Sequence, residues 1–116
     1  MAFKSYENAD ELRRVQLVST KILAEFDRVC RELSIPYVAY AGTAIGAVRH
    51  HGFIPWDDDV DIAMTRADYE QFLEFAPARL GEQFSIVNSR NEPDFPSTYS
   101  YLALNSTYFI PEFYRN

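Results

Sequence analysis

The chain has 116 residues, with 11 Lys and Arg against 17 Asp and Glu and a formal net charge of −6. This length suffices for one domain with one core, and 47% hydrophobic and 16% aromatic residues exclude the composition of a disordered chain. The acidic balance disfavours non-specific binding to nucleic acid, and the lone Cys30 excludes an internal disulfide. Because no apolar run suits a secretory signal or a membrane span, we expect a cytoplasmic protein.

The order of predicted elements indicates an α/β fold. Apolar residues recur at helical spacing near the N-terminus, and aromatic or branched runs between turn residues are typical of strands. In chain order we expect a long amphipathic helix at 10–33, a buried strand at 37–41, a short helix at 44–49, a strand at 57–64, a helix at 66–80, a strand at 84–87, and a hairpin of 99–104 with 107–110. Cys30 is expected to be a core residue of the first helix. Thr65 is expected to cap the helix at 66–80, whose inward-facing residues are Tyr69, Phe72, Leu73, Phe75 and Ala76. This order predicts a sandwich of helices on a sheet with mixed strand directions.

Alternating aspartates characterise the segment 57–64. In extended geometry Asp57, Asp59 and Asp61 project from one face, with neighbours about 6.6 Å apart, so their charges repel. Hard oxygen ligands without nitrogen or sulfur suit Mg²⁺ or Mn²⁺. We therefore predict a divalent metal site, for which the alternative is a solvated acidic loop.

A glycine turn precedes the acidic segment. Gly42 lets the backbone approach a ligand closely, and Thr43 adds a hydroxyl group. Unpaired N–H groups at the start of the following helix suit a phosphate. Downstream, Arg49 could clamp a phosphate and His50 could assist it, although the helix dipole alone favours both residues there.

Two aromatic residues flank these motifs. Tyr40 precedes the glycine turn and Trp56 precedes the acidic run. Either ring could stack on a base or shield a choline-like cation. Core packing is the simpler interpretation of both.

The segment AGTAIGAVRHHGFIPWDDDVDIAM closely resembles the signature of the LicD family, which includes phosphocholine transferases and fukutin-related proteins. The family has a nucleotidyltransferase fold, with a mixed sheet flanked by helices. The resemblance covers roughly residues 12–110 and implies a single LicD-like domain over 1–116.

Carried over residue by residue, the resemblance places a phosphate-binding turn at Gly42 and Thr43. It places the metal-binding pair at Asp59 and Asp61, and a further acid of the same strand at Asp57. Arg49, His50 and Gly52 match the linking helix and loop. The implied reaction uses Mg²⁺ or Mn²⁺, a nucleotide-activated donor such as CDP-choline and a glycan hydroxyl as acceptor.

The chain departs from the family pattern near its C-terminus. Between Asp94 and Glu112 the sequence has no acidic residue that could supply a third carboxylate, and we expect this chain to lack the acceptor-binding segments of the family's C-terminal half. A truncated chain, a minimal member completed by self-association and an inactive relative are each consistent with this. Exposed apolar surface left by the missing half would favour a homodimer.

Three functions follow from these observations. The first is transfer of a phosphocholine-like group to a glycan, with Asp57 positioning the acceptor or taking its proton. The second is nucleotidyl transfer to a protein or small molecule, and the third is binding of nucleotide or metal without turnover.

Overall fold

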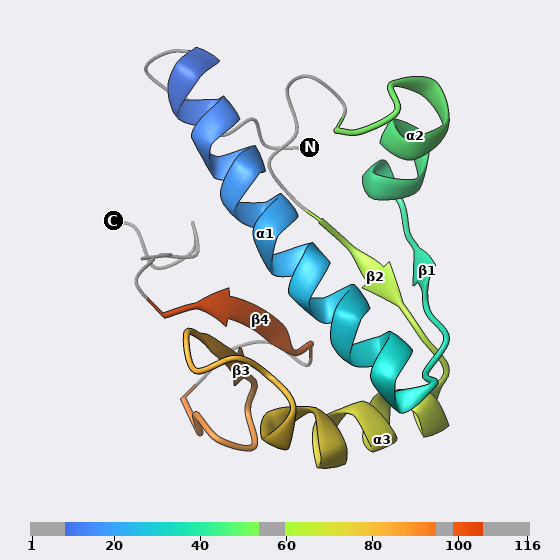
Figure 1. Ribbon diagram of the computed structural model, residues 1–116, viewed down its shortest axis with the longest axis vertical. Coiled ribbons are helices and arrows are strands. Elements are labelled where there is room, and N and C mark those ends of the chain that lie inside the picture. The colour runs from blue at the N-terminus through green and yellow to red at the C-terminus, as the bar shows by residue number, and fades with distance from the viewer. Residues whose placement is uncertain (1–8, 54–59, 95–98, 106–116) are drawn as a thin grey trace.

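The computed structural model describes residues 9–53, 60–94 and 99–105 (Figure 1). These ranges contain three α-helices, one short 3-10 helix and four short strands. In chain order they are α1 (Ala9–Leu33), β1 (Val38–Ala39), α2 (Gly42–Arg49), β2 (Ile62–Ala63), α3 (Arg66–Phe75), η1 (Ala76–Ala78), β3 (Phe84–Val87) and β4 (Tyr101–Leu104).

The long N-terminal helix is confirmed within one residue of its predicted bounds. Its apolar face buries Val29 and Cys30, which are 0% and 1% exposed. The helix ends at Leu33, and Ser34 takes a left-handed conformation with φ of 55°, from which the chain turns toward Pro36. Burial raises the pKa of the Cys30 thiol to about 11, so this cysteine is protonated at neutral pH, as a core residue is expected to be.

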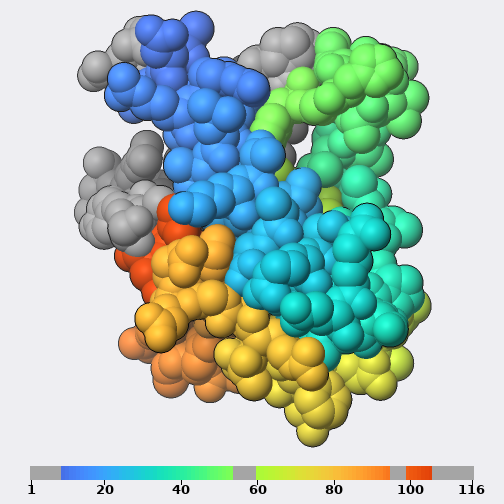
Figure 2. Space-filling model, viewed as in Figure 1, coloured from blue at the N-terminus to red at the C-terminus, as the bar shows by residue number. Residues whose placement is uncertain are grey.

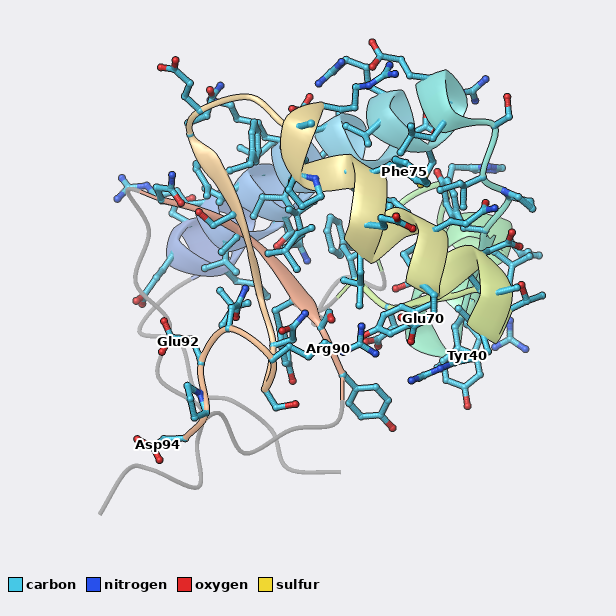
Figure 3. All side chains as sticks on the ribbon, turned by 90° about the horizontal axis from the view of Figure 1, so that it is seen from below. Tyr40, Glu70, Phe75, Arg90, Glu92 and Asp94 are labelled. Carbon is cyan, nitrogen blue, oxygen red and sulfur yellow. The ribbon has the colours of Figure 1, made fainter. Side chains whose placement is uncertain are left out.

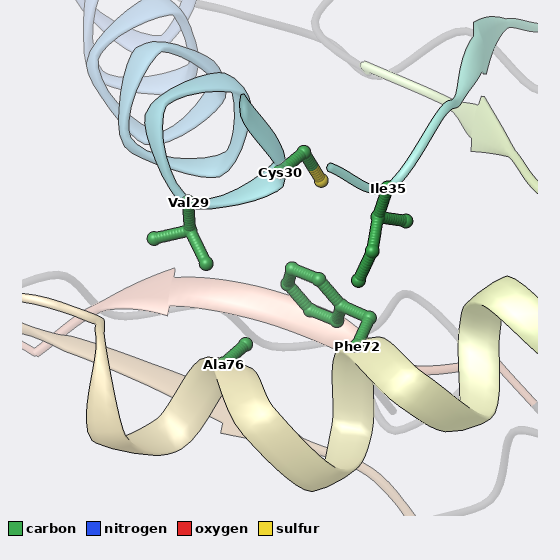
Figure 4. Packing of buried hydrophobic residues seen from close by; sticks show 5 residues of the cluster. All are labelled: Val29, Cys30, Ile35, Phe72 and Ala76. Atoms are coloured by element: carbon green, nitrogen blue, oxygen red, sulfur yellow. The ribbon is translucent and has the colours of Figure 1, made fainter. Parts of the chain in front are cut away.

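The core lies between α1 and α3. Val29, Cys30, Ile35, Phe72 and Ala76 form its buried centre (Figure 4). Two aromatic contacts extend it, because the Phe26 ring lies 5.1 Å from the Phe72 ring and 4.9 Å from the Tyr37 ring. The expectation that Phe75 faces inward is wrong, since its side chain is 50% exposed. Phe72 and Ala76 are about 40° apart around the helix, whereas Phe75 lies about 100° from Ala76, so Phe75 is at the edge of the buried face.

The cap of the third helix is confirmed. Thr65 Oγ1 accepts a hydrogen bond from the Asp68 N–H at 3.2 Å and donates one to Asp68 Oδ2 at 2.8 Å. The helix is shorter than the predicted 66–80. It gives way at Ala76 to η1, which contains Pro77, and proline cannot donate the backbone hydrogen bond of a helix interior.

Side chains of α1 fix the chain after η1. Glu25 Oε2 accepts from the Gly81 N–H at 2.7 Å, and Arg28 donates to the Arg79 carbonyl at 2.8 Å. Arg28 also binds Glu25 at 2.7 Å. The Glu25–Arg28 ion pair therefore provides hydrogen-bond partners for the Gly81 N–H and the Arg79 carbonyl, which follow η1.

The strands differ from the expected single mixed sheet. In the described residues they form two separate two-stranded sheets, β1–β2 and β3–β4, and both pairs are antiparallel. In Figure 1, α1 runs diagonally across the molecule, with β1–β2 on its right and β3–β4 on its left. After α2 the chain enters β2 at the end of the small sheet where it left β1, so the two strands are antiparallel. A parallel pair would need a connection that crosses back to the end of the sheet where β1 begins.

The C-terminal strands agree only in part with the prediction. Strand β3 is confirmed at 84–87, and β4 begins at Tyr101 rather than at 99. Its partner is β3, with Phe84 opposite Leu104. The expected partner segment 107–110 lies outside the described residues. Among the helices that the structure describes, none has the length and apolar character needed to cross a lipid bilayer.

Candidate functional site

A tight turn joins β1 to α2. The Thr43 N–H donates to the Tyr40 carbonyl at 3.2 Å, and Ala41 has φ of 51° and ψ of −128°. These angles are those of the first central residue of a type II′ turn, a position that normally takes glycine. Helix α2 begins at Gly42, two residues earlier than predicted. Gly42 and Thr43 are therefore the first residues of a helix that follows a strained alanine.

The turn contacts the acidic segment directly. The Asp61 N–H donates to Thr43 Oγ1 at 2.7 Å, and the Tyr40 N–H donates to the Asp61 carbonyl at 3.0 Å. A hydroxyl that accepts one hydrogen bond still has its own proton to donate. The Thr43 side chain thus holds the backbone of Asp61 while keeping a donor for a ligand.

Tyr40 and Asp61 share one face of the small sheet. Strand β1 pairs Val38 with Ala63 and Ala39 with Ile62, and the hydrogen bond from Tyr40 to Asp61 continues this register by one residue. Residues directly opposite one another in an antiparallel pair project to the same side. Both Tyr40 and Asp61 are exposed there.

A strand does form within the predicted 37–41, at Val38–Ala39, but the prediction that it is buried, with Tyr40 in the core, is wrong. Val38 is 63% exposed and Tyr40 is 61% exposed. Figure 3 shows the labelled Tyr40 ring at the periphery of the molecule. The interior next to Tyr37 is filled by Phe26 and Phe72, and β1 lies outside it, with both Val38 and Ala39 exposed.

Arg49 and His50 lie at the other end of α2. Both are exposed, and the His50 N–H donates to the Gly46 carbonyl at 2.8 Å, which closes the last turn. Eight helical residues separate the two ends by about 10 Å. The structure therefore brings Thr43 and Asp61 together but places Arg49 and His50 one helix length away, and their role in binding substrate stays a prediction.

The metal site predicted from the aspartates is covered only in part. Asp57 and Asp59, like Trp56, lie outside the described residues, while Asp61 is described and exposed. Within 9–53, 60–94 and 99–105, no group of three or more His, Cys, Asp or Glu side chains gathers in a way that could hold a metal ion. The oxygen donor of Asp61 suits Mg²⁺, and Asp59 as its partner remains a prediction.

Sequence reasoning missed a polar cluster between α3 and the segments that flank the β3–β4 sheet. Arg90 donates to both carboxylate oxygens of Glu70, at 2.7 and 2.9 Å (Figure 3). The Arg90 hydrogen bond holds the pKa of the Glu70 carboxyl below its ordinary value. Nearby, Asn88 donates to Ser100 Oγ at 3.1 Å, and the Ser100 and Tyr69 hydroxyls are also hydrogen-bonded to each other. These partners are far apart in the sequence, so no local pattern indicates the cluster, and it ties α3 to the β3–β4 sheet.

Most of the chain that follows α1 is similar to a known protein family. The family described as "LicD/FKTN/FKRP, nucleotidyltransferase domain" matches residues 34–108. The lipopolysaccharide cholinephosphotransferase LicD of Haemophilus influenzae is 49% identical over 63 residues, which is 54% of this chain and 24% of that protein. The uncharacterized protein RP689 of Rickettsia prowazekii is 43% identical over 60 residues, or 50% of this chain and 23% of that protein.

A second rickettsial relative, the uncharacterized protein RT0683 of Rickettsia typhi, is 46% identical over 44 residues, 38% of this chain and 14% of that protein. The chain therefore spans a quarter or less of the length of these relatives. No solved structure was found to match it. Because the family match covers more than half of its residues, the chain belongs to the LicD/FKTN/FKRP nucleotidyltransferase domain family.

Proposed function

We propose that this chain carries the donor-phosphate and metal site of a transferase that moves a phosphocholine-like group from a nucleotide-activated donor to a glycan hydroxyl. The observation that carries the proposal is the 2.7 Å hydrogen bond from the Asp61 N–H to Thr43 Oγ1, which joins a glycine turn to an acidic strand. Partial identity to a lipopolysaccharide cholinephosphotransferase supports the choice of substrate class.

The turn supplies the contacts for the phosphates of the donor. The Thr43 and Ile45 N–H groups already donate to the Tyr40 and Ala41 carbonyls, so backbone contacts to a phosphate would come from the N–H groups of Gly42 and Ala44 at the start of the helix. Gly42 has no side chain to block this approach, and Thr43 can donate its hydroxyl proton. A diphosphate such as that of CDP-choline fits this donor set.

The aspartates of the acidic segment would hold the metal ion and accept the proton of the acceptor hydroxyl. Asp59 and Asp61 would hold Mg²⁺, which when bound neutralises charge on the phosphate oxygens. The glycan hydroxyl oxygen forms a bond to the phosphorus that bears choline, and the bond from that phosphorus to the bridging oxygen of the donor breaks. CMP leaves with the electron pair of that bond, and we assign the hydroxyl proton to Asp57.

Substitution of the metal pair tests the proposal. Asp59→Asn and Asp61→Asn should each lower Mg²⁺-dependent release of CMP from CDP-choline at least about 100-fold in the presence of a lipopolysaccharide acceptor, which raises the barrier by about 2.7 kcal/mol. Asp94→Asn serves as the matched control, since Asp94 lies at the opposite side of the molecule from Tyr40 (Figure 3). Equal turnover in all three variants would refute the assigned roles.

The description of the family as a nucleotidyltransferase domain favours one alternative, transfer of the nucleotide itself. The two reactions differ in which part of the donor stays on the acceptor. A donor labelled in the cytidine and, separately, in the choline distinguishes them: choline label on the acceptor supports the proposal, and cytidine label on the acceptor supports nucleotidyl transfer.

A further inference from the structure

Tyr40 is an exposed aromatic residue next to the glycine turn of the proposed site. Its side chain is 61% exposed at the end of β1, and the next residue but one begins α2. On this basis we propose that the Tyr40 ring binds the quaternary ammonium group of the donor and selects choline over uncharged substituents of similar shape. The inference rests on the proposed function and names the part of the donor that this face of the sheet recognises.

The register fixes Tyr40 next to the proposed reaction site. The hydrogen bond from the Tyr40 N–H to the Asp61 carbonyl makes the two residues a cross-strand pair, and such residues have Cβ atoms about 5 Å apart on the same face. In phosphocholine only two carbons separate the phosphate oxygen from the ammonium nitrogen. A phosphate held between Thr43 and Asp61 therefore places its ammonium group within reach of the Tyr40 ring.

The chemistry of this face suits a methylated cation. An ammonium group over an aromatic ring is attracted by the negative face of the π-system. A bound metal ion would neutralise the Asp61 carboxylate, so the ring can attract the ammonium group where that carboxylate cannot. Val38 lies two residues before Tyr40, projects to the same side of the strand and is 63% exposed. The ring and the branched side chain together offer an apolar surface for N-methyl groups.

Other exposed aromatic residues are placed elsewhere. Tyr99 and Tyr101 are 73% and 45% exposed and belong to the region of β4, while Phe75 ends α3. Among the large exposed side chains of the described ranges, Tyr40 is the aromatic one that shares a face with Asp61. Tyr99 thus provides a matched control.

Calorimetric titration in Mg²⁺ tests the inference. Two ligands are compared, CDP-choline and its carbon isostere, in which a tert-butyl group replaces the trimethylammonium group. The wild-type protein should bind CDP-choline about tenfold more tightly than the isostere. Tyr40→Phe retains the ring and should keep this ratio, Tyr40→Leu should reduce it to about one, and Tyr99→Leu should leave it unchanged.

CMP serves as a third ligand, because it keeps the base and lacks choline. Tyr40→Leu should bind CMP as the wild-type protein does. The inference is overturned if the wild-type protein binds CDP-choline and its isostere equally well, or if Tyr40→Leu leaves the ratio of the two affinities unchanged. In either case, binding of CDP-choline to the wild-type protein still supports the proposed function. Equal weakening of CMP and CDP-choline in Tyr40→Leu assigns the ring to the base and also overturns it. Absence of CDP-choline and CMP binding in the wild-type protein refutes the proposed function as well.

Discussion

Among single residues, Ala41 has a backbone conformation that disagrees with its residue type. An alanine with φ of 51° and ψ of −128° occupies a conformation that glycine adopts at little cost. Backbone strain of this kind costs about 1–3 kcal/mol and persists where surrounding contacts enforce it. Here the contacts are the hydrogen bonds that Thr43 makes to Tyr40 and Asp61.

We therefore expect Ala41→Gly to raise stability. Relief of the strained conformation outweighs the entropy that glycine adds to the unfolded chain, so the free energy of unfolding should increase by about 1 kcal/mol. Urea denaturation of the two proteins measures the change. A lower free energy of unfolding in the glycine variant would show that the turn is not strained.

Thr43 links the turn to the acidic strand through its hydroxyl. Thr43→Val keeps the shape of the side chain but removes the acceptor for the Asp61 N–H, and we expect a loss of about 1 kcal/mol in the free energy of unfolding. Thr43→Ser restores the hydroxyl and should recover most of this loss. Exchange of the Asp61 amide hydrogen provides a direct readout, because it should be faster in the valine variant alone. Equal exchange in both variants would contradict the contact.

Among the elements, α1 holds the chain that follows η1 through Glu25. The Arg28 guanidinium, aided by the Gly81 N–H, holds the pKa of the Glu25 carboxyl below its ordinary value of 4.5, although partial burial opposes this shift. Because the unfolded chain binds the proton more readily, this stabilisation is fully present above pH 4.5 and is lost as the pH falls through the folded-state pKa.

Glu25→Gln should therefore make the stability of the protein less dependent on acid pH. We expect the variant to lose less of its free energy of unfolding than the wild-type protein when the pH is lowered below 4.5. Denaturation curves at a series of pH values measure this. Glu74→Gln, at an exposed position of α3, is the control for the loss of one negative charge. If the free energy of unfolding of Glu25→Gln falls with pH as steeply as that of the wild-type protein, the prediction is contradicted.

The packing of α3 on α1 depends on one aromatic side chain. Phe72 is 5% exposed and contacts the Phe26 ring, so Phe72→Ala should lower the free energy of unfolding by about 3–4 kcal/mol. Phe75→Ala is the matched control in the same helix, since Phe75 is half exposed and should cost about 1 kcal/mol or less. Chemical denaturation distinguishes the two, and similar costs would mean that Phe75 is buried in solution.

At the scale of the whole molecule, packing is uneven. Buried residues gather where α1, α3 and η1 meet, whereas the α2 residues Ile45 and Val48 are 48% and 79% exposed. Figure 2 shows α2 standing apart from the N-terminal part of α1. The proposed site thus lies on the part of the fold with the fewest buried contacts, as is common for binding segments.

Hydrogen exchange should reproduce this division. We expect amides of α2 to exchange at least about tenfold faster than amides in the last two turns of α1, because opening α2 exposes little apolar surface. Mass spectrometry of peptides from 42–49 and 26–33 measures both rates in one experiment. Equal protection of the two peptides would indicate that α2 is covered in solution, for example by a second copy of the chain.

Local patterns predicted those elements whose determinants are local. Helix α1 follows from apolar spacing and a proline, the start of α3 follows from Thr65 and Asp68, and β3 follows from a short apolar run. The motif from Gly42 to Asp61 also sufficed to indicate the family that residues 34–108 match. Periodicity placed Phe75 inward in error, because a run of apolar residues on both sides of a helix does not tell which side is packed.

Neighbouring residues were enough to place the three helices, the Thr65 cap of α3 and the family, because helical periodicity, capping and a contiguous motif are local properties of a chain. Three other features became known from the fold alone: the strands of the described residues form two antiparallel pairs, Tyr40 faces solvent, and Tyr40 lies opposite Asp61 beside Thr43. Strand pairing and the choice of the buried face depend on contacts between residues about twenty positions apart, and no local pattern specifies which of these partners meet.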